Sequence, residues 1–157
     1  MEERGNSQGG KLRLLYIDDD SDDRELFEEA LSRIDIATEV VMVDSCMEGM
    51  KVLNEQGHNK FDLIFLDINL PAIDGRECLK MLKADAALKN TAVVMLTNSR
   101  SDRDIDLAYS FGAHYHMIKP VAYINLIASL KLIFEINWKE EQPIPSRDKF
   151  VINYAFK

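Results

Sequence analysis

Reactive side chains directly follow four apolar runs in this chain. The runs are short and rich in β-branched and aromatic residues, which is typical of strands covered on both faces of a parallel sheet. The runs are residues 12–17, 61–66, 91–96 and 115–118, and the side chains that follow them are Asp18 with Asp19, Asp67, Thr97 and Lys119. Because the carboxyl ends of parallel strands share one edge, where open α/β sheets bind their ligands, we expect these side chains to converge.

This set of side chains suits phosphoryl transfer to an aspartate. Clustered carboxylates repel one another unless a cation holds them, and oxygen ligands of this kind suit Mg²⁺. A metal ion and an ammonium group neutralise phosphoryl oxygens, and a hydroxyl group donates to one of them. Asp67, alone at the end of its strand, is the expected nucleophile, because carboxylates form acyl phosphates in covalent catalysis.

Helical patterns separate the expected strands. Apolar residues recur at helical spacing over 21–34, 45–56, 75–84, 101–111 and 121–138, and a further strand is expected over 39–43. Asp22 and Glu25 have the spacing of a capping box, and so do Ser45 and Glu48. Gly112 is a C-cap signal. Five strands alternating with five helices favour an α/β fold with a single parallel sheet flanked by helices.

Composition limits the class of protein. The 157 residues suffice for one domain, and the apolar fraction of 46% and charged fraction of 29% are ordinary for a globular protein. Asp and Glu outnumber Lys and Arg by 27 to 19, a net charge of −8, which argues against nucleic-acid binding. The chain shows neither a signal peptide nor a membrane-spanning run, so we expect a cytoplasmic protein without membrane contact. Cys46 and Cys78 lack metal-ligand spacing and are expected to be buried, reduced thiols.

Three segments are distinguished along the chain. Residues 1–10 are polar and rich in glycine, and we expect a disordered leader there. Residues 11–138 contain all the expected strands and helices and form one domain. Residues 139–157 form a C-terminal tail in which Pro143 and Pro145 disfavour a helix, and which is too short to be an output domain. Within it, residues 150–156 are apolar enough to pack somewhere.

The ordered motifs of residues 12–138 resemble the receiver domain of two-component response regulators. The motifs are Ile17-Asp18-Asp19, Leu66-Asp67-Ile68-Asn69-Leu70-Pro71 with Asp74-Gly75, Leu96-Thr97, and Gly112-Ala113 before Lys119-Pro120. The resemblance implies a flavodoxin-like (βα)5 fold, a three-layer sandwich with a parallel five-stranded sheet of order 2-1-3-4-5. Residues 84–90 and 97–101 also resemble the stand-alone receivers associated with bacterial phytochrome-type histidine kinases.

The resemblance implies a role for each side chain at the phosphoryl group. Asp67 would accept the phosphoryl group from a phosphohistidine of a sensor histidine kinase, and Thr97 and Lys119 would bind the acyl phosphate. The family commonly has a cis peptide before the proline that matches Pro120. The chain would then be no enzyme beyond self-catalysed phosphotransfer and autodephosphorylation. Its output would be contact with a downstream protein or onward transfer to a phosphotransfer protein.

The resemblance also implies a Mg²⁺ site. Asp19, Asp67 and the backbone carbonyl of Asn69 would hold the ion, with Asp18 acting through water. The first strand is followed by a third acid, which leaves the register of these ligands slightly open. The further acids at this point of the chain are interpreted as a solvated helix start favoured by the helix dipole: Asp20, Asp22 and Asp23.

His116 stands where receivers usually carry Phe or Tyr, three residues before the lysine. In the family, that ring swings inward on activation. One interpretation is that His116 is a tolerated planar ring, half-buried in the last strand. The alternative is a switch whose rotamer couples to the Thr97 hydroxyl and adds pH sensitivity.

The last helix carries apolar residues on two faces. Leu132 and Ile136 lie opposite the face that is expected to pack in the core. On that outer face a surface helix should be polar. This second stripe predicts a contact surface. Either the chain forms a homodimer through the last helix, or residues 150–156 fold back over the stripe.

Two other functions are considered for the same residues. A phosphatase of the haloacid-dehalogenase type also uses Asp, Thr, Lys and Mg²⁺, but it needs Asp-x-Asp on the nucleophile strand. This chain has Asp67-Ile68-Asn69 there, and its acid pair precedes the nucleophile instead of following it. A degenerate receiver that acts only as a binding module is disfavoured, because every residue that the chemistry needs is present.

Overall fold

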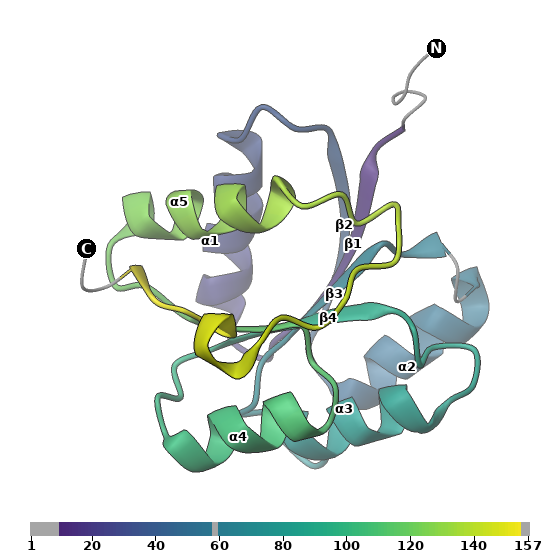
Figure 1. Cartoon of the computed structure of the whole chain (residues 1–157). Coiled ribbons are helices and arrows are strands. Elements are labelled where there is room, and N and C mark those ends of the chain that lie inside the picture. Colours follow the sequence, from purple (N-terminus) through teal and green to yellow (C-terminus); the bar gives the residue numbers. More distant parts are fainter. Residues whose placement is uncertain (1–9, 58–59, 155–157) are drawn as a thin grey trace.

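The computed structural model describes residues 10–57 and 60–154, which form one sheet covered by helices on both faces (Figure 1). The strands are β1 (Leu12–Ile17), β2 (Thr38–Val43), β3 (Leu63–Leu66), β4 (Ala92–Thr97), β5 (Tyr115–Ile118) and β6 (Val151–Ile152). The helices are α1 (Ser21–Ser32), α2 (Cys46–Gln56), α3 (Gly75–Ala84), α4 (Asp102–Ser110) and α5 (Tyr123–Phe134), and a 3₁₀ helix, η2, spans Arg147–Lys149. Apart from Gly10, the expected leader lies outside the described residues.

The sheet has the order β2-β1-β3-β4-β5-β6, and each neighbouring pair of strands is parallel. This arrangement confirms the flavodoxin-like fold and the predicted order 2-1-3-4-5. The sixth strand was not predicted: Val151 and Ile152 of the tail pair with His116 and Met117 of β5. Because all strands are parallel, the carboxyl ends of β1, β3, β4 and β5 lie along one edge. No helix within the described ranges is long and apolar enough to span a membrane.

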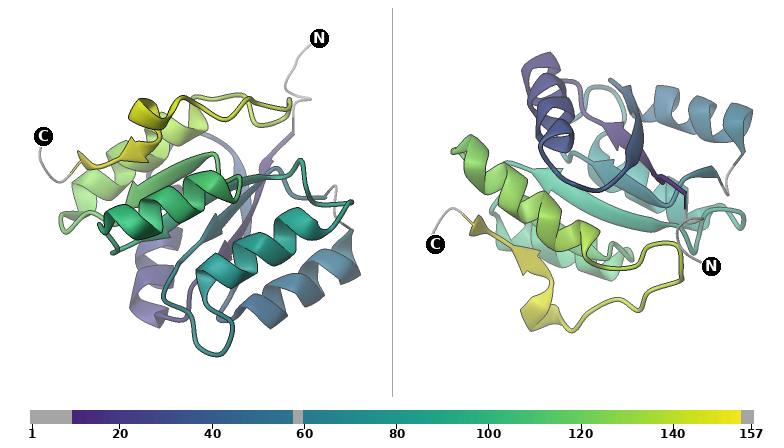
Figure 2. Two further views of the ribbon diagram at one scale, coloured as in Figure 1. Left: turned by 60° about the horizontal axis from the view of Figure 1, so that its bottom comes forward. Right: turned by 90° about the horizontal axis from the view of Figure 1, so that it is seen from above.

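The alternating side chains of the strands divide the core into two layers. Helices α2, α3 and α4 cover one face of the sheet, and α1 and α5 cover the other (Figures 1 and 2). On β1, Leu15 and Ile17 pack in the first layer, whereas Leu14 and Tyr16 pack in the second. Strands buried on both faces must be apolar at successive positions, which explains the near-continuous runs in the sequence.

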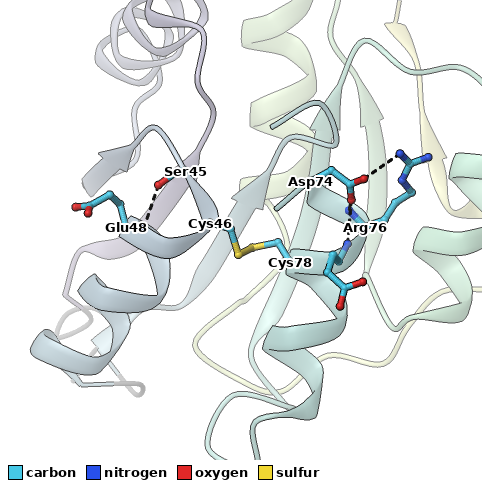
Figure 3. The surroundings of a disulfide bond; sticks show 7 residues. Ser45, Cys46, Glu48, Asp74, Arg76 and Cys78 are labelled. Atoms are coloured by element: carbon cyan, nitrogen blue, oxygen red, sulfur yellow. Dashed lines mark hydrogen bonds and ion pairs between the residues drawn. A yellow bond between two sulfur atoms is a disulfide. The ribbon is translucent and has the colours of Figure 1, made fainter. Parts of the chain in front are cut away.

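Helix caps fix the loops that leave the strand ends. The cap of α1 differs from the expected capping box: the carboxylate of Asp20 accepts hydrogen bonds from the backbone N–H groups of Asp22 and Asp23. Asp20 is therefore the N-cap, and the prediction that Asp22 has this role is wrong. Ser45 caps α2 as predicted and accepts from the N–H of Glu48 (Figure 3).

A disulfide joins Cys46 at the start of α2 to Cys78 in α3 (Figure 3). Both residues are buried, as predicted, but the prediction of reduced thiols is wrong. The two helices pack side by side on one face of the sheet, which brings the two Cα atoms to 5.8 Å. The sequence shows that each cysteine faces the core, whereas the pairing depends on which helices are neighbours.

The C-terminal tail packs back against the domain at the β5 edge of the sheet (Figure 2). Phe150 is fully buried, and its ring lies edge-on to that of Tyr109 in α4, with centroids 5.0 Å apart. Two polar contacts extend this attachment along α4: the Tyr109 hydroxyl donates to the carbonyl of Pro145, and Arg147 pairs with Asp106. The tail thus occupies the side of the molecule formed by α4 and β5.

The predicted outer stripe of the last helix is covered in part by the same tail, although α5 ends at Phe134, short of the predicted residue 138, and Ile136 lies just beyond it. Leu132 and Ile136 line a hollow of about 520 Å³ together with residues 151–154 of the tail. Ile136 is half-buried, whereas Leu132 remains 41% exposed. Of the two alternatives for this stripe, the fold-back is therefore observed, but it leaves part of the stripe open.

Candidate functional site

Asp18, at the end of β1, is fully buried and held by three donors. The Tyr16 hydroxyl donates to its Oδ2 at 2.6 Å, the backbone N–H of Asp20 donates to its Oδ1 at 2.9 Å, and the Lys119 ammonium donates to Oδ2 at 2.7 Å. Tyr16 lies on the same strand face as Asp18, because side chains alternate along a strand. Burial, together with the charge of Asp18, raises the pKa of Tyr16 far above its ordinary value, so Tyr16 stays a donor.

Asp67 follows β3 and is 4% exposed. The backbone N–H of Asn69 donates to its Oδ1 at 3.3 Å, and that of Gly75 donates to the Ile68 carbonyl at 2.8 Å. The start of α3 lies so close that a Cβ atom on residue 75 would overlap the carbonyl oxygen of Asp67, which explains the glycine. Burial raises the pKa of Asp67, while Lys119 and a hydrogen bond from Thr97 oppose this shift and Asp18 adds to it.

Lys119 follows β5, and its side chain is 10% exposed. Its backbone N–H donates to the Thr97 carbonyl at 2.8 Å, which continues the ladder between β4 and β5. Burial alone would lower the pKa of Lys119, but hydrogen bonds to Asp18 and Asp23 and the charge of Asp67 raise it above its ordinary value. The described residues contain no cis peptide bond, so the prediction of a cis bond before Pro120 is wrong.

The ammonium group of Lys119 is shared by three carboxylates. Its Nζ lies 2.7 Å from Oδ2 of Asp18, 2.7 Å from Oδ2 of Asp23 and 3.2 Å from Oδ2 of Asp67. An ammonium group has three N–H donors, so each carboxylate can take one. The predicted convergence of Asp18, Asp67 and Lys119 at one sheet edge is thus present.

The carboxylates of Asp18, Asp19 and Asp67 form a cluster that suits a metal ion. One oxygen of each lies within 4.8 Å of the others, and Asp19 is exposed at the open side. An all-oxygen donor set with one solvent-facing ligand fits a hard divalent cation that keeps part of its water shell. The residues present therefore fit the predicted metal, and the carbonyl of Asn69 as a further ligand stays a prediction.

Thr97 and His116 lie on the neighbouring strands β4 and β5, and both are fully buried. The Thr97 hydroxyl accepts a hydrogen bond from the backbone N–H of Ser99 at 3.3 Å. Nε2 of His116 lies 3.0 Å from the carbonyl oxygen of the same Ser99. His116 therefore contacts the loop that follows Thr97 and is buried more deeply than the predicted half-buried ring.

Two residues of the site were not predicted from the sequence. Asp23 was interpreted as part of a solvated helix start, but its carboxylate binds Lys119, so that interpretation is wrong for this residue. A signal was available, because Asp23 lies one helical turn beyond the Asp18-Asp19-Asp20 run, on the turn that starts at the sheet edge. The role of Tyr16 could also be expected, since it precedes Asp18 by two positions on the same strand face.

Comparison with known proteins agrees with this arrangement. Residues 14–131 match the family described as the response regulator receiver domain. Response regulator Rcp1 of Synechocystis sp. (strain ATCC 27184 / PCC 6803 / Kazusa) is 30% identical over 137 residues, which cover 85% of this chain and 92% of Rcp1. The structure of RcpA, a phosphorylated cyanobacterial phytochrome response regulator, is 34% identical with a TM-score of 0.74, covering 87% of this chain and 100% of that one.

A second solved structure bears on the acidic cluster. The Mn²⁺-bound form of Rcp1 is 30% identical with a TM-score of 0.70, and the match covers 85% of this chain and 99% of that one. One family accounts for three observations together: the fold, the acidic cluster with its lysine, and the match over residues 14–131. The chain belongs to the response regulator receiver domain family.

Proposed function

We propose that this protein is a response regulator of a two-component phosphorelay that accepts a phosphoryl group on Asp67. The observation that carries the proposal is the meeting of Asp67 with the Asp18-Asp19 pair and with Lys119, whose Nζ lies 3.2 Å from Asp67 Oδ2. The donor is the phosphohistidine of a sensor histidine kinase. A phytochrome-like kinase is the proposed source, and the likeness to RcpA, a phytochrome response regulator, supports it.

The proposed step transfers the phosphoryl group in line. A carboxylate oxygen of Asp67 attacks phosphorus, the new O–P bond forms as the P–N bond breaks, and the electron pair stays on the imidazole nitrogen. Lys119 and Thr97 then donate hydrogen bonds to phosphoryl oxygens. Asp19, Asp67 and the Asn69 carbonyl would hold Mg²⁺, with Asp18 acting through water, and the ion would supply positive charge that offsets the carboxylates and the phosphoryl group. Activity is limited to this self-catalysed phosphotransfer and to autodephosphorylation.

The proposed output is a change in protein contact at the side formed by α4, β5 and α5. Phosphorylation favours one of two arrangements only if the phosphoryl group contacts them differently. His116 is proposed as the switch residue, because its ring contacts the Ser99 carbonyl and its backbone N–H donates to the Phe150 carbonyl at 3.0 Å. A movement of Thr97 and Ser99 towards the phosphoryl group would therefore reach the tail through His116.

The proposed partners follow from this output. They are a downstream protein or phosphotransfer protein and, through the last helix, a second copy of this chain. The exposed part of the α5 stripe, Leu132, supports the homodimer. The tail competes for the same stripe, since residues 151–154 line one hollow with Leu132 and Ile136.

Labelling with a small acyl phosphate tests the phosphoryl acceptor. With Mg²⁺, the wild-type protein is expected to gain acid-labile phosphate. The Asp67→Asn variant is expected to gain none, because an amide of the same shape lacks the nucleophilic oxygen, and removal of Mg²⁺ by a chelator should suppress labelling of the wild type. Labelling of Asp67→Asn would contradict the proposal. A wild-type protein that takes up no label would favour a binding module, and turnover of a generic phosphomonoester would favour a phosphatase.

A further inference from the structure

Among the described residues, Asp23 is the one partner of the Lys119 ammonium that does not come from a strand end. Its Oδ2 lies 2.7 Å from Nζ, as close as Asp18 and closer than Asp67 at 3.2 Å. Asp23 is also outside the group of carboxylates that can share a metal ion, which is made of Asp18, Asp19 and Asp67. Asp23 takes no part in the phosphoryl chemistry proposed above. Because its carboxylate contacts Lys119, its effect on that chemistry passes through Lys119.

The first turn of α1 fixes the position of Asp23. Asp20 caps this turn and accepts from the N–H groups of Asp22 and Asp23, and its own N–H donates to Asp18. The Arg24 guanidinium donates to the Asp18 carbonyl at 2.6 Å and ties the helix to the end of β1. Asp23 is thereby held beside the sheet edge with its side chain 27% exposed, whereas Asp22 is exposed.

All three N–H donors of Lys119 are taken by carboxylates in this arrangement. To donate to the oxygens of a phosphoryl group on Asp67, Lys119 has to redirect at least one of these N–H groups, and Asp23 is the partner that lies on α1, away from the strand ends. Among the described residues, Lys119 is the side chain that donates to Asp23, and no second one does so. If the redirected N–H group is the one that donates to Asp23, the Asp23 carboxylate loses its cation.

We propose that Asp23 is a positioning residue that holds Lys119 on the α1 side of the site and opposes its transfer to the phosphoryl group. The inference rests on the proposed function, because it concerns the equilibrium between the resting and the phosphorylated site. Asp23 stabilises the resting arrangement through its pair with Lys119, and its negative charge also disfavours an added phosphoryl dianion. Removing the charge should therefore favour the phosphorylated arrangement.

Binding of beryllofluoride, a stable phosphoryl mimic, measures this equilibrium in the presence of Mg²⁺. In Asp23→Asn, the dissociation constant for beryllofluoride is expected to fall about two- to fivefold, the range for a partly exposed ion pair. Asp22→Asn is the matched control, because it removes the same charge from the same helical turn at an exposed position. Its effect should be less than half as large. Equal effects of the two variants, or weaker binding by Asp23→Asn, would overturn the proposal.

Two further measurements separate the contact from a general effect on folding. Asp23→Glu keeps the charge and should bind beryllofluoride within about twofold of the wild type; tightening as large as in Asp23→Asn would overturn the proposal. In the metal-free protein, NMR signals of the Lys119 ammonium protons should be protected from exchange. Asp23→Asn should lose this protection and Asp22→Asn should keep it, whereas unchanged protection in Asp23→Asn contradicts the contact.

The outcomes also distinguish the inference from the proposed function. If the wild-type protein neither takes up acid-labile phosphate nor binds beryllofluoride, both the proposed function and the role of Asp23 are contradicted. If it takes up phosphate and binds beryllofluoride, but Asp23→Asn behaves like Asp22→Asn, only the role of Asp23 is contradicted and Asp67 stays the proposed phosphoryl acceptor.

Discussion

Two buried histidines lie close together in the sequence at β5: His116 within the strand and His114 just before it. Burial lowers the pKa of His116 and of His114, although each ring contacts one backbone carbonyl, that of Ser99 or that of Gln142. Both rings are therefore neutral near pH 7. In the unfolded chain, each returns to an ordinary pKa of 6.5, so the unfolded state binds more protons below that pH.

The free energy of unfolding is expected to fall as the pH drops below 6.5, towards the lowered pKa values of the folded protein. Each buried histidine contributes a slope of up to about 1.4 kcal/mol per pH unit. His116→Phe keeps a planar ring but removes one titrating group, so its slope between pH 7.5 and 5.5 should be smaller. Urea unfolding across this range measures the slopes directly. Equal slopes for wild type and variant would show that His116 does not stay neutral in the folded state.

At the scale of elements, the sequence predicted most of what positions the site. The apolar runs located β1, β3, β4 and β5, and the residues after them became the site because parallel strands end at one edge. The features that were missed depend on contacts between elements distant in sequence. Asp23 required the direction of the first turn of α1, and the disulfide required knowing that α2 and α3 are neighbours. Strand β6 is too short to have a pattern of its own.

The disulfide between α2 and α3 should contribute strongly to stability. It closes a loop with a sequence separation of 32, and the chain-entropy relation for such a loop gives about 3 to 4 kcal/mol. Addition of a reductant should lower the free energy of unfolding by about this amount. The Cys46→Ala/Cys78→Ala double variant is the control, because its stability should not respond to the reductant. A wild-type protein equally insensitive to reductant would contradict the contribution.

At the scale of the whole molecule, the tail connects the site to the surface. Phe150 lies between α4 and β5, its carbonyl accepts from the N–H of His116, and the strand that follows it forms the sheet edge. The side on which the output is proposed is therefore partly filled by the protein's own C-terminal segment. Any partner that uses this side, including a second copy, has to compete with the tail.

Phe150→Ala should loosen the tail without unfolding the domain. Truncation of a fully buried Phe costs about 3 to 5 kcal/mol of stability. Because the tail can detach locally, this cost mainly lowers the free energy of opening β6. Hydrogen exchange at the His116 amide should accelerate roughly 100-fold, while the amide of Met95 in the central strand β4 changes much less. Sedimentation velocity of the same variant then tests the competition. Because detachment uncovers Leu132 and Ile136, the dimer fraction should rise, whereas a fall would mean that the tail itself belongs to the dimer contact.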